Sequence, residues 1–330
     1  MIKTLEIKNF KSIKYQRLDC KRINIFIGEP NTGKSNLLET VALFSYGCYG
    51  AQGYNFKDFV RFERIGNLFY DENLHDTVEV KFDSKALDLE FKDGVFQGKI
   101  TVIDKQWDKP SKLVTFDGGV SDVYHRGGDP KVMSSFKFYR FVVKETFNRP
   151  ESDFLLPPSG DNLFSLLLAH RELKATAGRL FTPFGLRLGF RPQERKLEVI
   201  KQIEDTIISY PYSLASETLQ RLVFHMAAIL SNKDSVLAFE EPETHAFPYY
   251  TKYLAEVIAL DTNNNQYFIT THNPYFLLPI LEKCPREDIG VFITYFEDYQ
   301  TKVKPLSEKD MAEIMQIDVF SNLDRFLKPG

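Results

Sequence analysis

The sequence contains few cysteines and no long apolar run. Its three cysteines, Cys20, Cys48 and Cys284, lie far apart and form no CxxC pair, which argues against a disulfide framework and against a structural zinc site. The N-terminal residues alternate charged and apolar side chains and lack the apolar core of a signal peptide. No later stretch approaches the roughly 18 uninterrupted apolar residues of a membrane helix. We therefore expect a cytoplasmic protein that is neither exported nor inserted in a membrane.

An excess of positive charge and an internal repeat are also absent. The formal net charge is -3 and the sequence pI is about 6.1. No global field therefore favours nucleic acid, and any contact with DNA has to be local. The chain shows no heptad run or other repeat, which argues against a long coiled-coil arm. With 330 residues, 43% of them hydrophobic, it can bury the cores of about two domains.

A phosphate-binding loop is predicted near the N-terminus. Residues 22–27 (RINIFI) have the composition of a strand, and SNLLETVALFSYG from residue 35 has the apolar spacing of a helix. Between them, GEPNTGKS matches GxxxxGK[ST] in the strand, loop, helix order that this motif requires. Backbone amides of such a loop bind phosphate groups, helped by the positive end of the helix. The predicted nucleotide-binding residues of the loop are Gly28, Glu29, Pro30, Asn31, Thr32, Gly33, Lys34 and Ser35.

ATP and Mg²⁺ are the predicted ligands of this loop. Lys34 is expected to reach the β- and γ-phosphates, and the Ser35 hydroxyl to bind Mg²⁺. A chance glycine turn before a helix is the alternative, and the flanking strand and helix argue against it.

An acidic strand end supplies the carboxylates that hydrolysis needs. In SVLAFEEPETH, residues 236–239 form an apolar strand, and Glu240 and Glu241 follow at its carboxyl end, where open parallel sheets bind ligands. Glu240 is expected to hold the magnesium shell, and Glu241 to polarise the attacking water. Without a P-loop, we would interpret the same pattern as a charged exit from a strand, closed by Pro242.

A histidine follows the next predicted strand. FITTHNPYF places His272 just past a buried run, where an imidazole can donate to the γ-phosphate and respond to its loss. A lone histidine is more often a satisfied polar group. The order of P-loop, EEPE and TTHNP favours the catalytic interpretation. His245 lies in the loop after the acidic pair, where it is placed to report across a subunit interface.

These motifs together resemble a known family. IKNFKSI, GEPNTGKSNLLE, LAFEEPETHAFP and ITTHNPYFL are similar to the ATPase domain of the RecF, SMC and OLD (overcoming lysogenisation defect) branch of ABC proteins. More narrowly, they resemble AAA-type ATPases of prokaryotes that stand alone or accompany a nuclease, including those of phage defence. The resemblance covers residues 1–50 and 210–330. It implies an α/β fold with an ABC-type core, in which helices flank a parallel or mixed sheet.

The middle of the chain has a different pattern. Residues 77–143 show short alternating runs, residues 159–181 a helical stretch, and residues 184–208 further strands. We predict the first part of the ATPase core at 1–54 and an inserted lobe of antiparallel strands and helices at 55–209. The second part of the core follows at 210–330, with a helix at 214–230 and strands at 235–240 and 265–271.

The resemblance also implies an assembly. Members of this branch form head-to-tail dimers that trap ATP between the P-loop of one subunit and a signature helix of the other. A homodimer or higher homo-oligomer is therefore expected. By the same analogy Lys11, Asn31 and Asn36 lie beside the nucleotide, with Lys11 on a phosphate.

The signature segment departs from the family pattern LSxG, because residues 214–218 read LASET. A carboxylate aimed at a triphosphate opposes binding by about 1 kcal/mol at 4 Å in water, so either Glu217 turns away or the pairing is altered. Ser216, with Ser213 and Thr218, still offers hydroxyls near a helix N-terminus. Arg221 lies one turn further on. Alternatively, SLASET only caps a core helix.

Two functional hypotheses follow. The first is an ATP-hydrolysing switch that dimerises around ATP and controls a separate nuclease or toxin, in phage defence or DNA maintenance. The residues after GVFITYF are too few for the TOPRIM nuclease domain of OLD proteins. The second is a nucleotide-gated scaffold with little or no hydrolysis, favoured by Glu217 and opposed by the Glu240 and Glu241 pair. The absence of LSGGQ argues against a transporter subunit. Neither a Q-loop glutamine nor a role for the basic aromatic stretch 55–69 is assigned.

Overall fold

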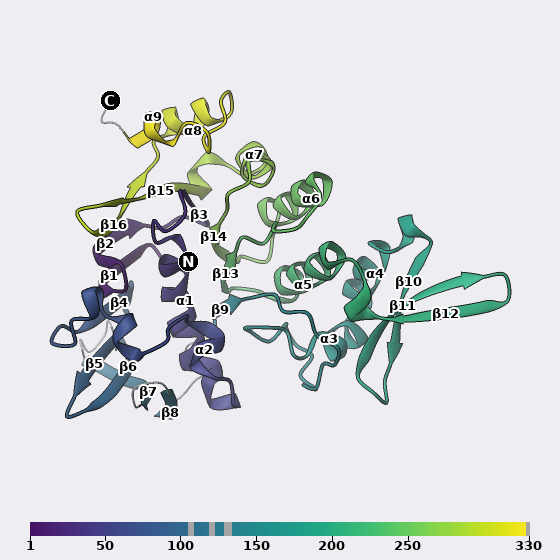
Figure 1. Cartoon of the computed structure of the whole chain (residues 1–330), viewed down its shortest axis with the longest axis horizontal. Coiled ribbons are helices and arrows are strands. Elements are labelled where there is room, and N and C mark those ends of the chain that lie inside the picture. The colour runs from purple at the N-terminus through teal and green to yellow at the C-terminus, as the bar shows by residue number, and fades with distance from the viewer. Residues whose placement is uncertain (105–108, 119–122, 129–133, 328–330) are drawn as a thin grey trace.

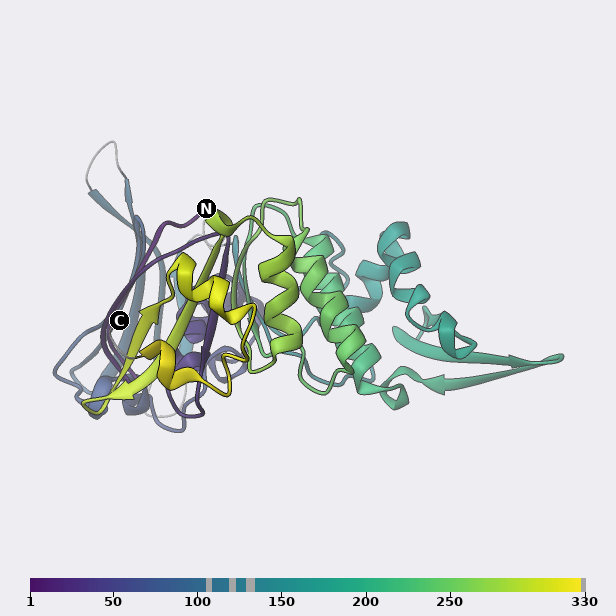
Figure 2. The ribbon, with the colours of Figure 1, turned by 90° about the horizontal axis from the view of Figure 1, so that it is seen from above.

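The computed structural model describes residues 1–104, 109–118, 123–128 and 134–327. The molecule is elongated (Figure 1). Two large sheets lie at one end, a layer of helices follows, and a small sheet projects at the other end (Figure 2).

A six-stranded mixed sheet lies at the centre of the fold. Its strands are β3 (Ile23–Gly28), β9 (Phe136–Tyr139), β13 (Val236–Glu240), β14 (Gln266–Thr270), β15 (Ile289–Glu297) and β16 (Gln300–Pro305). Their order is β16-β15-β3-β14-β13-β9. All neighbours pair in parallel except β16, which closes an antiparallel hairpin with β15. The predicted α/β class, with a mixed sheet flanked by helices, is confirmed.

Helices cover both faces of this sheet, which explains why its inner strands are apolar throughout. Every residue of β3 and β14 is buried, as is typical of parallel sheets with helices on each side. Alternate residues point to opposite faces: Ile25 belongs to the core beneath the helices that follow β12, and Phe26 to the core around the P-loop helix. The helices are α1 (Lys34–Tyr49) on one face and α5 (Glu217–Ser231), α6 (Pro248–Ala259) and α7 (Pro274–Lys283) on the other.

A seven-stranded antiparallel sheet covers the other side of α1. Its order is β2-β1-β4-β5-β6-β7-β8, with β1 (Thr4–Phe10), β2 (Ile13–Asp19), β4 (Val78–Phe82), β5 (Lys85–Lys92), β6 (Val95–Asp104), β7 (Lys109–Gly118) and β8 (Val123–Gly128). Leu5 and Val80 from this sheet, Leu38 from α1 and Phe268 from the central sheet share one core. The P-loop helix is therefore packed between two sheets, and fourteen of its sixteen residues are buried.

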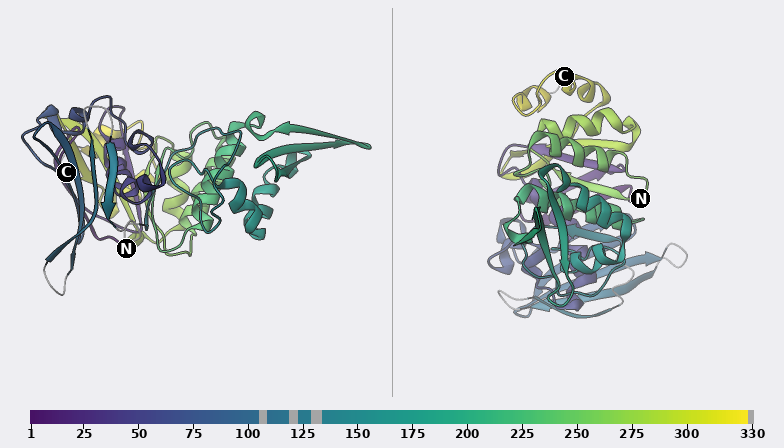
Figure 3. Two further views of the ribbon diagram at one scale, coloured as in Figure 1. Left: turned by 90° about the horizontal axis from the view of Figure 1, so that it is seen from below. Right: turned by 90° about the vertical axis from the view of Figure 1, so that its right-hand side faces the viewer.

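The small projecting sheet is built from β10 (Leu186–Arg191), β11 (Lys196–Ile203) and β12 (Thr206–Pro211). Two short helices, α3 (Leu163–Ala169) and α4 (Arg171–Arg179), join it to α5. Most of β12 is exposed. At the opposite side of the central sheet from β4–β8 lie the C-terminal helices α8 (Glu308–Ile314) and α9 (Leu323–Leu327), as Figure 3 shows.

The segment 55–209, which we expected to be one inserted lobe, contributes to three different sheets. After the short helix α2 (Phe56–Phe59), strands β4–β8 extend the sheet that β1 and β2 begin, and β9 is an edge strand of the central sheet. The helices α3 and α4 and the strands β10–β12, within residues 163–211, build the projecting part. The difference arises because strand partners lie far apart in sequence: Ala238 is paired with Phe138, which no local pattern indicates.

No helix in the described ranges combines the length and the apolar character that crossing a membrane would take.

Candidate active site

The five parallel strands of the central sheet end at one edge, and the predicted catalytic segments follow three of them. The P-loop follows β3, the segment with His272 follows β14, and Glu240 and Glu241 stand at the end of β13. Since β3, β14, β13 and β9 are consecutive parallel neighbours, their carboxyl ends meet at the same edge. The structure therefore brings together segments that are separated by more than 200 residues.

The shape of the P-loop depends on two glycines packed against the β15–β16 hairpin. Gly28 has φ 151°, and a Cβ at this position would lie 2.3 Å from the carbonyl oxygen of Thr294. Gly33 has φ 90°, and a Cβ there would lie 2.1 Å from Oγ1 of Thr301. Thr32 adds a hydroxyl contact to Oγ1 of Thr294 at 2.7 Å. The β15–β16 hairpin thus fixes the backbone of the loop on one side. On the other side of the loop, Glu29, Pro30 and Asn31 are exposed.

Lys34 folds back onto the loop that precedes it. Its Nζ donates to the carbonyl oxygens of Gly28 at 2.8 Å and Glu29 at 2.7 Å. Burial lowers the pKa of Lys34, while the negative charges of Glu241 and Glu29 oppose that effect. Lys34 is the first residue of α1, after the loop that follows β3, and Glu241 follows β13 at the same edge of the central sheet. A phosphate bound at the P-loop would compete with the two carbonyls for the amine.

The start of α1 is tied to the turn between β1 and β2. Asn36 Nδ2 donates to the Ser12 hydroxyl at 2.7 Å, and Ser35, beside it, is partly buried. Lys11 lies next to Ser12 and has a protein partner, since its amine pairs with the carboxylate of Glu39. Burial lowers the pKa of Lys11, and Glu39 counteracts this. Lys11 therefore lies beside the P-loop helix with its amine paired to Glu39, whereas the resemblance implied a contact between this amine and a phosphate.

Two arginines that the sequence did not identify flank Glu240. Arg61 Nη2 lies 3.0 Å from Glu240 Oε1, and Arg140 Nη2 lies 4.0 Å from Glu240 Oε2. Arg61 also bonds through Nε to the buried Glu39 at 3.0 Å. Burial disfavours the charged form of Arg61, but Glu240 and Glu39 together outweigh it and raise the pKa. The only sequence signals were the basic aromatic stretch 55–69 and the arginine that follows FKFY.

Glu241 and His272 form the contact at the centre of the site. His272 Nε2 lies 2.6 Å from Glu241 Oε1, and both side chains are more than one third exposed. Glu241 has φ 43°, a left-handed conformation that is uncommon for a residue with a Cβ. Its backbone N–H donates to the carbonyl oxygen of Thr270 at 3.1 Å. Strained backbone of this kind is concentrated at functional sites, and here it turns the carboxylate out of the sheet edge.

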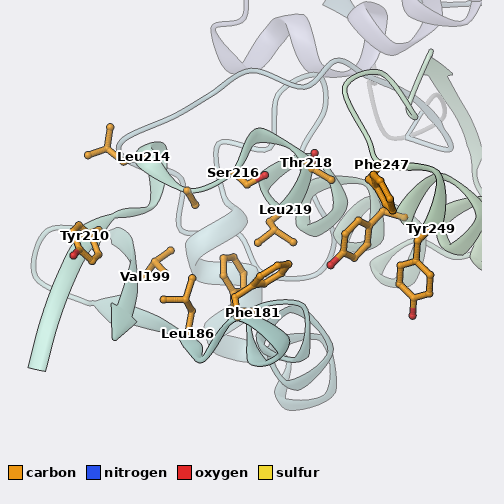
Figure 4. A pocket seen from close by; sticks show the side chains of 13 residues that line it. Phe181, Leu186, Val199, Tyr210, Leu214, Ser216, Thr218, Leu219, Phe247 and Tyr249 are labelled. Atoms are coloured by element: carbon orange, nitrogen blue, oxygen red, sulfur yellow. The ribbon is translucent and has the colours of Figure 1, made fainter. Parts of the chain in front are cut away.

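The signature segment lies at the N-terminus of α5, where Thr218 donates to the carbonyl oxygen of His245 in the turn after the acidic pair. Ser216 is the exposed N-cap residue of α5, and no hydrogen bond or ion pair within the described ranges joins it to the P-loop. Ser216 and Thr218 border a cavity of about 710 Å³ whose other walls are largely apolar (Figure 4). Leu214 is 74% and Phe247 is 68% exposed at its rim, so this face presents unusual apolar surface.

The charge of Glu217 is compensated within the chain. Its Oε1 accepts from Arg221 Nε at 2.8 Å and lies 3.2 Å from His245 Nδ1. The hydrogen bond from Arg221, followed by the contact with His245, lowers the pKa of Glu217. The carboxylate of Glu217 is therefore ionised and paired. Of the two arrangements that the sequence left open, Glu217 adopts the one in which its side chain turns away, toward Arg221 and His245.

The donor set at the sheet edge suits a magnesium nucleotide. Mg²⁺ prefers oxygen ligands and keeps several waters and phosphate oxygens, so the Ser35 hydroxyl and one Glu240 carboxylate oxygen are a sufficient protein contribution. In the part of the chain that the structure describes, no cluster of three His, Cys, Asp or Glu side chains forms a separate metal site. Arg61 presently neutralises Glu240 and would compete with a metal for it.

The α/β fold and the P-loop that follows β3 together are those of an AAA-domain protein of the nucleotide-binding class. The sequence from residue 23 to residue 278 matches the protein family described as "AAA domain, putative AbiEii toxin, Type IV TA system". Because this match covers most of the chain, the protein belongs to that family.

Individual relatives are more distant. The chain is 32% identical over 134 residues to the uncharacterized protein MJECL10 of Methanocaldococcus jannaschii, a match that covers 36% of this chain and 59% of that protein. The chain therefore spans less than two thirds of the length of this relative.

Solved SMC head domains share the fold. An SMC head bound to the C-terminal winged-helix domain of ScpA is 16% identical, with a TM-score of 0.55 over 94% of this chain and 99% of that chain. An SMC head with an extended coiled coil, bound to the C-terminal domain of ScpA from Pyrococcus furiosus, is 13% identical, with a TM-score of 0.50 over 96% and 98%. At these identities the likeness concerns the fold alone.

Proposed function

We propose that this protein hydrolyses ATP with Mg²⁺ and that its ATP-bound form dimerises and controls a separate effector. The observation that supports the proposal is that the segments carrying Lys34, the Glu240 and Glu241 pair, and His272 follow neighbouring strands at one edge of the central sheet, with Glu241 in contact with His272. These residue types are the ones that phosphoryl transfer to water requires.

Each residue of the site has its own role in the proposed hydrolysis. The amine of Lys34 leaves the carbonyls of Gly28 and Glu29 and binds the β- and γ-phosphates, while the P-loop amides hold the phosphate oxygens. Bound Mg²⁺, held by Ser35 and Glu240, would neutralise charge that develops on the phosphates. Glu241 orients the attacking water and accepts its proton.

His272 keeps the carboxylate of Glu241 in place through the 2.6 Å contact. It also presents an imidazole beside the position of the γ-phosphate. Loss of that phosphate then changes the surroundings of His272, which sits just before α7.

The assembly is proposed by analogy with the SMC head fold. In a head-to-tail dimer, Ser216 and Thr218 of one copy would close over the P-loop of the other. The apolar rim beside them would be covered at the same time. SMC heads in the solved structures bind ScpA, and the family description mentions a putative toxin. Both of these relationships are consistent with a separate protein effector in phage defence or DNA maintenance. The proposal includes a cytoplasmic location and is compatible with a local contact with DNA.

ATP turnover of wild type and Glu241→Gln tests the enzymatic part of the proposal. We expect phosphate release from the wild type, a loss of at least about 10²-fold in Glu241→Gln, as for removal of a general base, and unchanged ATP binding in both. Glu282→Gln, an exposed carboxylate on α7, is the matched control and should retain wild-type turnover. Equal rates in wild type and Glu241→Gln would refute the role of Glu241.

The scaffold alternative makes a different prediction for assembly. Its main support was the carboxylate of Glu217, and the pairing of Glu217 with Arg221 and His245 weakens that support. Light scattering after addition of ATP separates the two hypotheses. A hydrolysing switch assembles and then dissociates as ATP is consumed, whereas a scaffold stays assembled for hours and shows no phosphate release.

A further inference from the structure

A third glutamate, Glu243, is buried directly behind the acidic pair. It lies in the turn between β13 and α6 and is 5% exposed. The turn is closed by backbone bonds from Thr244 N to the Glu241 carbonyl oxygen and from Ala246 N to the Glu243 carbonyl oxygen, both 3.0 Å. The side chain of Glu243 consequently points into the protein, away from the solvent that Glu241 faces.

Glu243 joins the acidic turn to the segment that carries His272. Its Oε1 accepts from the Thr271 hydroxyl and, at 3.3 Å, from the backbone N–H of His272. Thr271 is itself held, since its N–H donates to the Phe26 carbonyl oxygen at 3.2 Å and its Oγ1 accepts from Asn273 N at 3.1 Å. One carboxylate oxygen thus anchors two successive residues of the β14–α7 connection.

The fold by itself gives no reason for a carboxylate at this position. The other oxygen of Glu243, Oε2, is inaccessible to solvent and has no hydrogen-bond partner among the described residues. Burial raises the pKa of Glu243 to about 7, against the hydrogen bonds from Thr271 and His272 that lower it. A buried, incompletely paired acid costs stability relative to an apolar side chain of similar size.

We propose that Glu243 is a positioning residue, which fixes His272 so that its imidazole meets Glu241. The inference rests on the proposed ATPase function and adds a residue to it. Glu241 and His272 approach each other from two different loops, and Glu243 is the side chain that bonds the first loop to the backbone of the second. Without it, the His272 backbone loses its acceptor and the 2.6 Å contact is no longer enforced.

Kinetics with paired variants provide the first test. Glu243→Ala removes the acceptor and Glu243→Gln keeps an acceptor oxygen. Thr271→Val and Thr271→Ser make the same comparison from the other side of the bond. We expect Glu243→Ala to lower kcat by about 10- to 100-fold, as misplacement of a catalytic group does, with KM and ATP affinity unchanged. Glu243→Gln and Thr271→Ser should restore most of kcat, and Thr271→Val should lower it.

A spectroscopic measurement keeps the test independent of turnover. With ¹⁵N-labelled histidine, the imidazole nitrogens of His272 report its contact with Glu241 in each full-length variant; His272→Gln assigns the signal among the six histidines. We expect Glu243→Ala and Thr271→Val to shift the His272 signal toward that of a free imidazole, and Glu243→Gln to leave it in place.

The outcomes separate this inference from the proposed function. An inactive wild type with the expected His272 shifts would refute the ATPase proposal and leave the positioning role supported. An active wild type, with Glu243→Ala and Thr271→Val folded, equally active and unshifted at His272, would overturn the positioning role alone. Equal loss of kcat in Glu243→Ala and Glu243→Gln, with an unshifted His272 signal, would also overturn it.

Discussion

The carboxyl edge of the central sheet and the N-terminus of α5 are the two regions that ATP would have to join, and they are built differently. At the sheet edge, charged side chains are densely paired: Lys34 with carbonyls, Glu240 with Arg61, and Glu241 with His272. At α5, Glu217 is neutralised locally, and apolar side chains surround the cavity beside it.

The difference indicates how each region would contribute to the free energies of nucleotide binding and of dimer association. At the sheet edge a magnesium nucleotide exchanges existing protein partners for phosphate and metal, so much of the electrostatic gain is offset. At α5 the exposed rim gains by being covered, since burial of apolar surface is favourable at roughly 25 cal/mol per Å². In the proposed dimer, the sheet edge therefore carries the catalytic groups, and the apolar surface beside α5 stabilises association of the two copies.

The largest effect is expected for a substitution at the sheet edge, which leaves the N-terminus of α5 unchanged. Lys34→Ala removes the phosphate-binding amine, and we expect ATP turnover to fall by at least about 10²-fold, as for loss of one charge-stabilising group, with ATP binding weakened in parallel. Isothermal titration and phosphate release measure both. Lys233→Ala, an exposed lysine before β13, is the control. Full turnover in Lys34→Ala would show that the sheet edge is not the phosphate site.

The second prediction concerns pH and the buried acid behind the sheet edge. Glu243 has a pKa of about 7 in the folded protein, above its ordinary value of 4.5. Its contribution to stability is complete below pH 4.5 and is lost as the pH rises through 7, by up to about 3 kcal/mol. Glu243→Gln should therefore gain stability relative to wild type as the pH rises from 4.5 to 7, with the difference levelling off above pH 7, measured by urea unfolding at fixed ionic strength. A pH-independent difference would contradict this.

A smaller effect tests the competition at Glu240. Arg61 is 52% exposed where it pairs with Glu240, and such a pair contributes up to about 1 kcal/mol. In Arg61→Ala we expect the Mg²⁺ concentration for half-maximal hydrolysis to fall by about fivefold or less, because the metal no longer displaces a cation. Arg64→Ala, exposed nearby, should leave it unchanged. A higher magnesium requirement in Arg61→Ala would show that Arg61 assists the metal.

The smallest effect belongs to the α5 region. The i,i+4 pair of Glu217 and Arg221 is worth about 0.3–0.5 kcal/mol. Arg221→Met leaves the Glu217 carboxylate with His245 as its remaining partner, so its negative charge opposes the nucleotide more strongly and ATP-driven association should weaken about twofold, and less at high salt. Glu217→Gln should not weaken it. Analytical ultracentrifugation with Glu241→Gln in the background measures both, and the opposite ranking would mean that Glu217 takes part in binding.

Local motifs were sufficient to predict the sheet edge. GEPNTGKS, FEEPE and TTHNP each follow an apolar strand. Because parallel strands bring their carboxyl ends together, the order of the motifs predicted that the segments with Lys34, Glu241 and His272 meet at one edge of the sheet, and the structure has Glu241 and His272 in contact there. The α/β class followed from the same alternation of strands and helices.

The parts that the sequence did not give are contacts between distant segments. The four residues of β9 resemble an antiparallel strand, and only pairing with β13 reveals them as part of the central sheet. Arg61 meets Glu240 across 179 positions of the chain. Nothing in the EEPE motif indicates that Glu243 is buried, with its carboxylate accepting from Thr271 in the next loop.

The most direct test is the structure of Glu241→Gln crystallised with ATP and Mg²⁺. We predict that the Lys34 amine has left the carbonyl oxygens of Gly28 and Glu29 for the β- and γ-phosphates, with the metal between Ser35 and Glu240 and the substituted position 241 facing the γ-phosphate. Nucleotide bound elsewhere, with Lys34 still hydrogen-bonded to those two carbonyls, would contradict the account.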